Sequence, residues 1–171
     1  MDRTMDIGLL VLRLAVGLTM AAHGGQKLFG WFGGYGIAGT GGWLESIGFR
    51  PGKVQAVLAG TFEFVGGLLI ALGLLTPVGA ALVITVMVTA IGSVHLPKGF
   101  WVTDGGFEYN LMILASSAAL SFTGPGAYSL DAVNGLLFGG WLPGVIAVLA
   151  GLVLGGGALA GRRPAPVARQ S

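Results

Sequence analysis

Long apolar segments, each close to the length needed to cross a lipid bilayer, follow one another along almost the whole chain. A membrane-spanning helix needs about 20 mostly apolar residues, since each residue adds only about 1.5 Å of length. Five segments are of this kind: 7–29, 54–75, 77 to about 96, the shorter 109–122, and 141–161. The sequence therefore predicts an all-α fold, a polytopic bundle of membrane helices.

The composition supports this prediction and excludes several functions. Charged residues make up 9% of the chain, against about 25% in soluble domains, so the chain lacks the polar surface that water requires. The net charge of +2 rests on few ionisable groups and does not indicate nucleic-acid binding. Because there are no cysteines, disulfides, thiolate metal sites and thiol redox chemistry within this chain are excluded. We expect the lipid bilayer to be its surroundings.

The basic residues predict an orientation in the membrane. We name the side on which segment 7–29 begins side A, and the opposite side B. With five spans, side A receives only Arg3. Side B receives Lys27, Arg50, Lys53, Lys98, Arg162, Arg163 and Arg169. Since basic residues concentrate in cytoplasmic loops, we expect side B to be cytoplasmic and the N-terminus external.

Polar residues from four of the five segments converge on side B. His23 and Lys27 are four residues apart, so they share one helix face. The stretch HLPKGFWVTDGGFEYN, residues 95–110, brings His95, Lys98, Asp104, Glu108 and Asn110 to the same end. Glu63 lies ~13 Å deep from side B at helical rise. This convergence predicts a polar pocket at one end of the bundle.

Ordinary structural roles remain open for most of these residues. Arg13 could extend its side chain to side A. His23 and Lys27 could anchor the helix at the interface, as tryptophans often do, and Lys98, Asp104 and Glu108 could be plain loop charges. Glu63 is harder to explain in this way. A carboxylate near the bilayer centre costs ~2.5–3.5 kcal/mol on insertion scales, so it should be neutral, paired or facing a polar cavity.

Several chemistries fit a pocket of this composition. Two histidines could ligate a haem iron, and histidine with carboxylates could bind a divalent metal or relay protons. A quinone headgroup needs one or two hydrogen-bonding groups at membrane level, which His23, Glu63 and His95 could supply. Two histidines without thiols make a poor closed site, so we expect neither haem nor metal as a constitutive component. No phosphate loop, dinucleotide fingerprint or nucleophile elbow occurs.

Glycine is unusually frequent, with 33 residues in the chain. Gly151 and Gly155, and then Gly157 and Gly161, have the spacing that lets helices approach closely in lipid. This spacing predicts tight packing within one bundle or, as an alternative, a contact with another chain. The glycine-rich stretch GWFGGYGIAGTGGW, residues 30–43, is interpreted as a flexible or re-entrant segment that covers side B.

Four stretches together resemble the DoxX family of small bacterial membrane proteins: RLAVGLTMAAHGGQKLFG, EFVGGLLIALGLLTP, VHLPKGFWVTDGGFEYNLMIL and TGPGAYSLD. The resemblance covers roughly residues 8–135. It places the family's helix 1 arginine at Arg13, its HGxxKL segment at 23–28, its acid at Glu63 and its later histidine at His95. It implies a multi-pass protein of the bacterial cell membrane. The family is named after a subunit linked to quinone-dependent oxidation of sulfur compounds.

From residues and resemblance together, we expect a four-helix DoxX-like domain over 1–135, an additional membrane helix within 136–161 and a polar, mobile tail over 162–171. The leading hypothesis is a redox-associated subunit that binds a quinone-like or other small ligand. His23, Glu63 and His95 would act on protons, and Arg13, Lys27, Glu108 and Asn110 would hold the ligand or keep Glu63 ionised. Other redox subunits, or a second copy of the chain, are the expected partners. The alternatives are a non-catalytic assembly subunit and a small-molecule permease.

Overall fold

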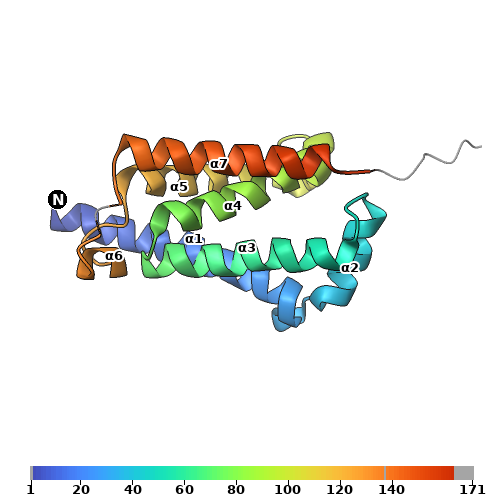
Figure 1. The fold of residues 1–171 in the computed structure, drawn as a ribbon, viewed down its shortest axis with the longest axis horizontal. Coiled ribbons are helices and arrows are strands. Elements are labelled where there is room, and N and C mark those ends of the chain that lie inside the picture. Colours follow the sequence, from blue (N-terminus) through green and yellow to red (C-terminus); the bar gives the residue numbers. More distant parts are fainter. Residues whose placement is uncertain (1, 137, 164–171) are drawn as a thin grey trace, which may run out of the picture.

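The computed structural model describes residues 2–136 and 138–163, and it is entirely helical apart from turns and loops. Five longer helices alternate in direction along the bundle: α1 (Arg3–Phe29), α3 (Gly52–Leu72), α4 (Thr76–Ala90), α5 (Glu108–Thr123) and α7 (Trp141–Ala160). In Figure 1, α1 and α3 form the lower part of the bundle, with α4, α5 and α7 above them. The predicted all-α membrane bundle is confirmed.

Local sequence signals explain where these helices begin and end. Asp2 caps α1 by accepting a hydrogen bond from the Thr4 amide, and α1 ends at Gly30, which is left-handed with φ 73°. Helix α3 ends in the same way at Gly73. Pro77 lies in the first turn of α4, where its missing amide hydrogen costs nothing.

Helices α1 and α3 approach closely because glycines face each other along the contact. A Cβ atom added to Gly17 would lie 2.5 Å from the Ala71 amide nitrogen, and one added to Gly24 would lie 2.4 Å from that of Phe64. Real Cβ atoms essentially never come so near, so only glycine permits this spacing. The contact fixes the register of α1 against α3, on which the site below depends.

The glycine pairs of α7 have different surroundings. Gly151 and Gly155 face α4, with Ile84 and Val88 close to where their Cβ atoms would stand. Gly157 has no neighbour within 4 Å of such an atom among the described residues. The first pair therefore serves packing within the bundle.

Four helices in the described residues are long and apolar enough to cross a membrane: Arg3–Phe29, Gly52–Leu72, Thr76–Lys98 and Trp141–Ala160. The sequence predicted a fifth span at 109–122. The corresponding helix α5 has only 16 residues, because the turns of residues 99–107 precede it and Gly124 ends it. At ~24 Å it is shorter than the ~30 Å hydrocarbon core.

The two ends of the bundle are closed by short elements. On side A, the four-residue helix α6 (Leu130–Val133) lies against the start of α4. On side B, helix α2 (Gly36–Ser46) covers the start of α3, and the 3₁₀ turn η1 (Trp31–Gly33) lies against the end of α1. The segment 30–43, interpreted as flexible or re-entrant, is thus largely helical, and Gly41 allows α2 to lie directly on the backbone of Gly52 and Lys53.

The chain starts on side A and its last described residues lie on side B, as Figure 1 shows. Arg162 donates from Nε to the Ile47 carbonyl (2.6 Å) and lies over the Phe49 ring, while the Arg163 amide donates to Gly48. The first two residues of the predicted mobile tail are therefore bound to the α2–α3 connection. The rest of that tail, 164–171, lies outside the described residues.

Candidate functional site

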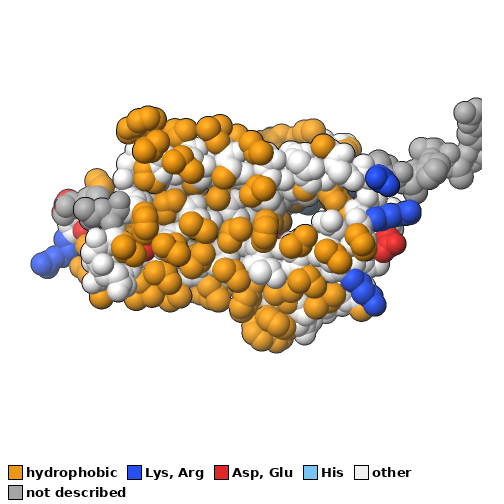
Figure 2. All heavy atoms as spheres, viewed as in Figure 1, with side chains coloured by type: hydrophobic (Ala, Val, Ile, Leu, Met, Phe, Trp, Pro, Cys, Tyr) orange, Lys and Arg blue, Asp and Glu red, His pale blue; other side chains and the backbone are white. Residues whose placement is uncertain are grey.

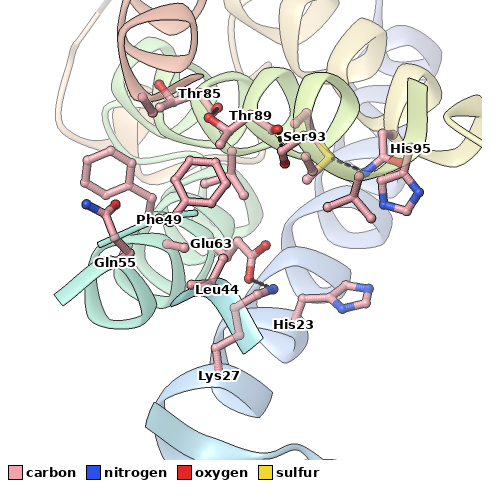
Figure 3. A pocket seen from close by; sticks show the side chains of 18 of the residues that line it. His23, Lys27, Leu44, Phe49, Gln55, Glu63, Thr85, Thr89, Ser93 and His95 are labelled. Atoms are coloured by element: carbon pink, nitrogen blue, oxygen red, sulfur yellow. Dashed lines mark hydrogen bonds and ion pairs between the residues drawn. The ribbon is translucent and has the colours of Figure 1, made fainter. Parts of the chain in front are cut away.

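A cavity of about 460 Å³ lies in the side-B half of the bundle, and we name it the inner cavity. Its wall is mostly apolar, with residues such as Met20, Leu58, Phe62 and Val86, and polar side chains are interspersed (Figure 3). The polar members come from α1, α3, the α4–η2 helix and the start of α5: His23, Lys27, Gln55, Glu63, Thr85, Thr89, Ser93, His95, Tyr109 and Asn110. Ligand pockets in proteins typically have this volume and this mixture.

Glu63 forms an ion pair with Lys27 in the wall of the inner cavity. The ammonium nitrogen of Lys27 donates to Oε2 of Glu63, and Figure 3 shows the two side chains pointing toward each other. The Glu63 side chain is 4% exposed, whereas that of Lys27 is 25% exposed. Because α1 and α3 run in opposite directions, the end of α1 lies beside the first half of α3. Lys27 therefore extends inward from side B and compensates the negative charge of Glu63.

His23 is oriented by an aromatic neighbour from α5. Its Nε2 atom lies 3.3 Å from the hydroxyl of Tyr109, and the two rings meet edge to face. Both groups can donate or accept a proton, so the direction of this hydrogen bond depends on the imidazole tautomer. A histidine hydrogen-bonded to a phenol beside a cavity is suited to proton exchange with a bound ligand.

His95 lies in the π-helical turn η2 (Ile91–His95), which extends α4 and is followed by the 3₁₀ turn η3 (Leu96–Lys98). Its Nδ1 atom donates to the Gly105 carbonyl over 2.7 Å. Since a carbonyl can only accept, Nδ1 carries the proton, and Nε2 of the neutral ring is left as an acceptor. Single π-helical turns are frequent at functional sites, where they redirect side chains.

Hydroxyl groups of α4 and of the η2 turn that extends it line another part of the inner cavity wall. Thr85, Thr89 and Ser93 follow at intervals of four residues, and each donates to the carbonyl four residues earlier, over 2.8, 2.8 and 2.6 Å. Their oxygen lone pairs remain available to a donor in the cavity. Asn110, a buried residue of α5, donates from its side-chain amide to the sulfur of Met87 in α4.

The structure brings five of the seven predicted site residues to one cavity, namely His23, Lys27, Glu63, His95 and Asn110. Glu108 is not among the lining residues. Its Oε2 atom accepts from the Val102 amide (2.9 Å), and so stabilises the turn η4 (Val102–Asp104) before α5.

Arg13 is the second predicted residue that lies elsewhere, and the expectation that it keeps Glu63 ionised is wrong. It precedes His23 by ten residues, so helical rise places it ~15 Å toward side A. Its side chain is fully buried, and Nη2 donates to the Tyr128 carbonyl. Gly73 makes room for the guanidinium, since a Cβ atom there would overlap Nη1. Arg13 therefore ties the residue 124–129 loop to α1 instead of extending to the membrane surface.

Sequence reasoning missed Tyr109 and the hydroxyl series of α4. Tyr109 stood beside the selected residues Glu108 and Asn110 but could pass for an ordinary interfacial aromatic. Thr85, Thr89 and Ser93 have the four-residue spacing of one helix face, and this periodicity was the available signal.

No group of three or more His, Asp or Glu side chains in the described residues is placed to hold a metal ion. One of the two histidines is engaged with Tyr109 and the other with Gly105. The arrangement can instead bind a ligand that offers both hydrogen-bond donors and acceptors. That haem and metal are absent from the isolated protein stays a prediction.

The outer surface of the bundle is strongly apolar. Figure 2 shows hydrophobic side chains spread along the length of the molecule, with the charged groups at the two ends. The same view shows the surface hollowed between α3 and the helices above it, nearer to the side-B end of the bundle. Leu154 and Ala158 of α7 contribute to the cavity wall, so the cavity borders on lipid-facing helices.

Comparison with known proteins identifies the family. The DoxX family pattern matches residues 8–96. The chain is 31% identical over 131 residues to "Putative oxidoreductase CatD" of Bacillus subtilis (strain 168), covering 77% of this chain and 90% of that protein. It is also 31% identical over 131 residues to "Inner membrane protein YqjF" of Escherichia coli (strain K12), covering 77% and 95%. "Uncharacterized membrane protein Rv3486" of Mycobacterium tuberculosis (strain ATCC 25618 / H37Rv) is 33% identical over 71% of this chain and 78% of that protein.

No solved structure matches the chain significantly. The membrane location predicted from composition agrees with relatives that are named inner membrane proteins. The matched range, 8–96, contains Arg13, the segment 23–28, Glu63 and His95. This chain is a multi-pass membrane protein of the DoxX family.

Proposed function

We propose that this protein is a small redox-associated membrane subunit that binds a quinone-like ligand in the inner cavity. The observation that carries the proposal is the Lys27–Glu63 ion pair, whose carboxylate is buried, in the wall of a mostly apolar cavity of about 460 Å³. A lipid-soluble ligand with a polar headgroup fits such a cavity, because its apolar part can contact the apolar wall while its headgroup lies near the ion pair. The name of the Bacillus subtilis relative, which contains the word oxidoreductase, supports the redox association.

The hydrogen-bonding groups around the ion pair supply complementary partners for such a headgroup. Nε2 of His95 is an acceptor in the neutral ring, whereas Lys27 and the Tyr109 hydroxyl can donate. His23 can pass a proton to or from the ligand through its second ring nitrogen. The sequence contains no evident electron carrier, so any redox reaction would need a bound cofactor or a partner protein.

The position of Trp43 in the cavity wall offers a direct binding test. Quinones quench indole fluorescence at short range, so a variant that keeps only Trp43 of the four tryptophans reports on the cavity. We expect saturable quenching by a short-chain quinone in detergent-purified protein. The matched control keeps only Trp141, at the start of α7 on side A, and should show weak, non-saturating quenching.

Extracted small molecules provide the second arm of the test. The purified protein should yield a quinone near one equivalent by mass spectrometry, and its absorption spectrum should lack a Soret band. Equal quenching at Trp43 and Trp141 would contradict the proposal. So would a Soret band that disappears in His23→Ala or His95→Ala protein.

The assembly-subunit alternative predicts co-purifying membrane proteins without any ligand. A permease would need a passage that reaches both faces. Buried apolar side chains that include Leu9, Val16, Ile70 and Leu120 fill the bundle on the side-A side of the inner cavity. This packing favours a binding pocket over a passage.

A further inference from the structure

A second pocket of about 560 Å³ lies on side B, next to the end of α1. We name it the outer pocket. The loop and helix that follow α1 provide most of its wall, through residues such as Gly34, Tyr35, Gly39 and Thr40. Tyr35 is 84% exposed, so this pocket opens on the surface of the molecule. Aromatic residues at such positions typically mark the membrane–water interface.

The inner cavity and the outer pocket share two lining residues, Lys27 and Trp43. Lys27 extends from the outer pocket to Glu63, whose side chain is 4% exposed and lines only the inner cavity. Trp43 is 48% exposed and lines both spaces. The two spaces therefore adjoin at Lys27 and at the indole ring of Trp43.

Protons cannot reach the inner cavity through the bilayer or through the packed core on the side-A side. Charges cross hydrocarbon only at a high free-energy cost, and Ile70 and Val83 of the core are completely buried. The outer pocket adjoins the inner cavity and opens on the surface at side B. A lysine side chain is suited to a change between two positions, since its long flexible chain can rotate while the ammonium group stays solvated.

We infer that Lys27 and Trp43 form a gate through which water and protons pass between side B and the inner cavity. In the closed state, the ammonium group of Lys27 is bonded to Glu63. When it swings into the outer pocket, Glu63 becomes reachable by water and can exchange protons with the side-B solution. Only one part of the inference rests on the proposed function, namely that a ligand enters the inner cavity from the lipid side and exchanges its protons through this gate.

The absence of cysteine makes the gate testable with a single introduced thiol. Ser93→Cys places this thiol in the inner cavity with almost no change in size. Membrane vesicles of both orientations are treated with a charged methanethiosulfonate reagent, which cannot cross lipid, or with N-ethylmaleimide, which can. The ratio of the two reaction rates measures access from water separately from general loosening of the fold.

We expect the charged reagent to react with Ser93→Cys protein from side B only. Trp43→Ala should raise the charged-to-lipophilic rate ratio several-fold. Trp31→Ala is the matched control, because Trp31 is 50% exposed in the neighbouring segment but lines neither space, and the ratio should not change. Lys27→Met should also raise the ratio, and Lys53→Met, at an exposed lysine on side B, should not.

Reaction from side A, or a rate ratio that Trp43→Ala leaves unchanged, would overturn the inferred gate. So would an equal rise in both rates, which indicates a loosened bundle. Labelling requires no ligand, so it separates the gate from the proposed function. If a short-chain quinone fails to protect the thiol while Trp43→Ala still raises the ratio, the quinone proposal fails and the gate stands.

Discussion

Glu63 and Lys27 show how a single ion pair can be tolerated within a membrane helix bundle. The carboxylate is almost fully buried, and the lysine that compensates it remains a quarter exposed. Taking both charges out of water into a membrane protein costs free energy, so the pair is retained only if its surroundings compensate for desolvation. Replacing Glu63 by an apolar residue removes the partner of Lys27, whereas replacing it by glutamine removes only the charge. The effects of these two changes on stability and on ligand binding distinguish a working site from a structural contact.

Glu63→Gln should fold and insert almost normally, losing about 1–3 kcal/mol, because glutamine can still accept a hydrogen bond from Lys27. Glu63→Leu should cost more, up to about 3–5 kcal/mol, because it leaves Lys27 without a partner. Unfolding in mixed micelles measures both values. We expect Glu63→Gln, and likewise His23→Gln, to abolish quenching of Trp43 by the quinone. Glu63→Gln protein that keeps full ligand occupancy and complements a deletion strain would reduce Glu63 to a structural residue.

At the scale of elements, α6 stabilises the start of α4 from a distant part of the sequence. Asp131 accepts from the amides of Leu75 (2.8 Å) and Thr76 (3.2 Å) and from the Thr76 hydroxyl (3.2 Å). Leu75, the residue at the N-cap position, makes no side-chain cap of its own. A buried carboxylate beside a helix N-terminus satisfies free amides and complements the helix dipole.

Asp131→Ala should therefore lower the free energy of unfolding by at least about 1–2 kcal/mol, the usual cost of losing a helix cap. Asp104→Ala provides the control, since Asp104 is exposed on side B and caps no long helix. Thermal unfolding in detergent compares the two variants. Equal melting temperatures would show that α4 does not depend on α6.

The glycine contact between α1 and α3 permits a matched comparison within one helix. Gly17→Ala should cost about 1–3 kcal/mol, because its Cβ atom would meet the backbone of α3. Gly8→Ala, at a position with nothing within 4 Å, should be neutral or stabilise by up to about 1 kcal/mol through helix propensity. Denaturant titration in micelles should order the variants Gly8→Ala, wild type, Gly17→Ala. The reverse order would mean that α1 and α3 are further apart than described.

At the scale of the whole molecule, the two ends have different roles. Side A is held together by internal contacts, including Asp6 with the Ala127 amide (2.9 Å) and Arg13 with Tyr128. Side B contains the inner cavity, the outer pocket and most of the basic residues. The division follows from the alternating helix directions, which bring the end of α1 and the starts of α3 and α5 to one side.

The excess of basic residues on side B, seven against one, predicts that this side is cytoplasmic. A reporter fused after Ser171 should be active in the cytoplasm, and one placed before Met1 should be external. Paired enzyme reporters with opposite compartment requirements measure both positions. A cytoplasmic N-terminus would overturn the five-span topology, or show that the lysines of the site, and not those of the loops, determined the bias.

The sequence by itself determined the membrane location, the helical class and the convergence of His23, Lys27, Glu63, His95 and Asn110, because hydropathy and helix direction act along the chain. Only the tertiary structure decided how these residues pair. The register of α1 on α3, determined by glycine contacts, places Lys27 beside Glu63, and the fold of the 124–129 loop provides Arg13 with the Tyr128 carbonyl. The closeness of Tyr109 to His23, and of Asp131 to α4, likewise joins residues distant in sequence. Helical periodicity describes one helix, whereas such contacts depend on how neighbouring helices pack.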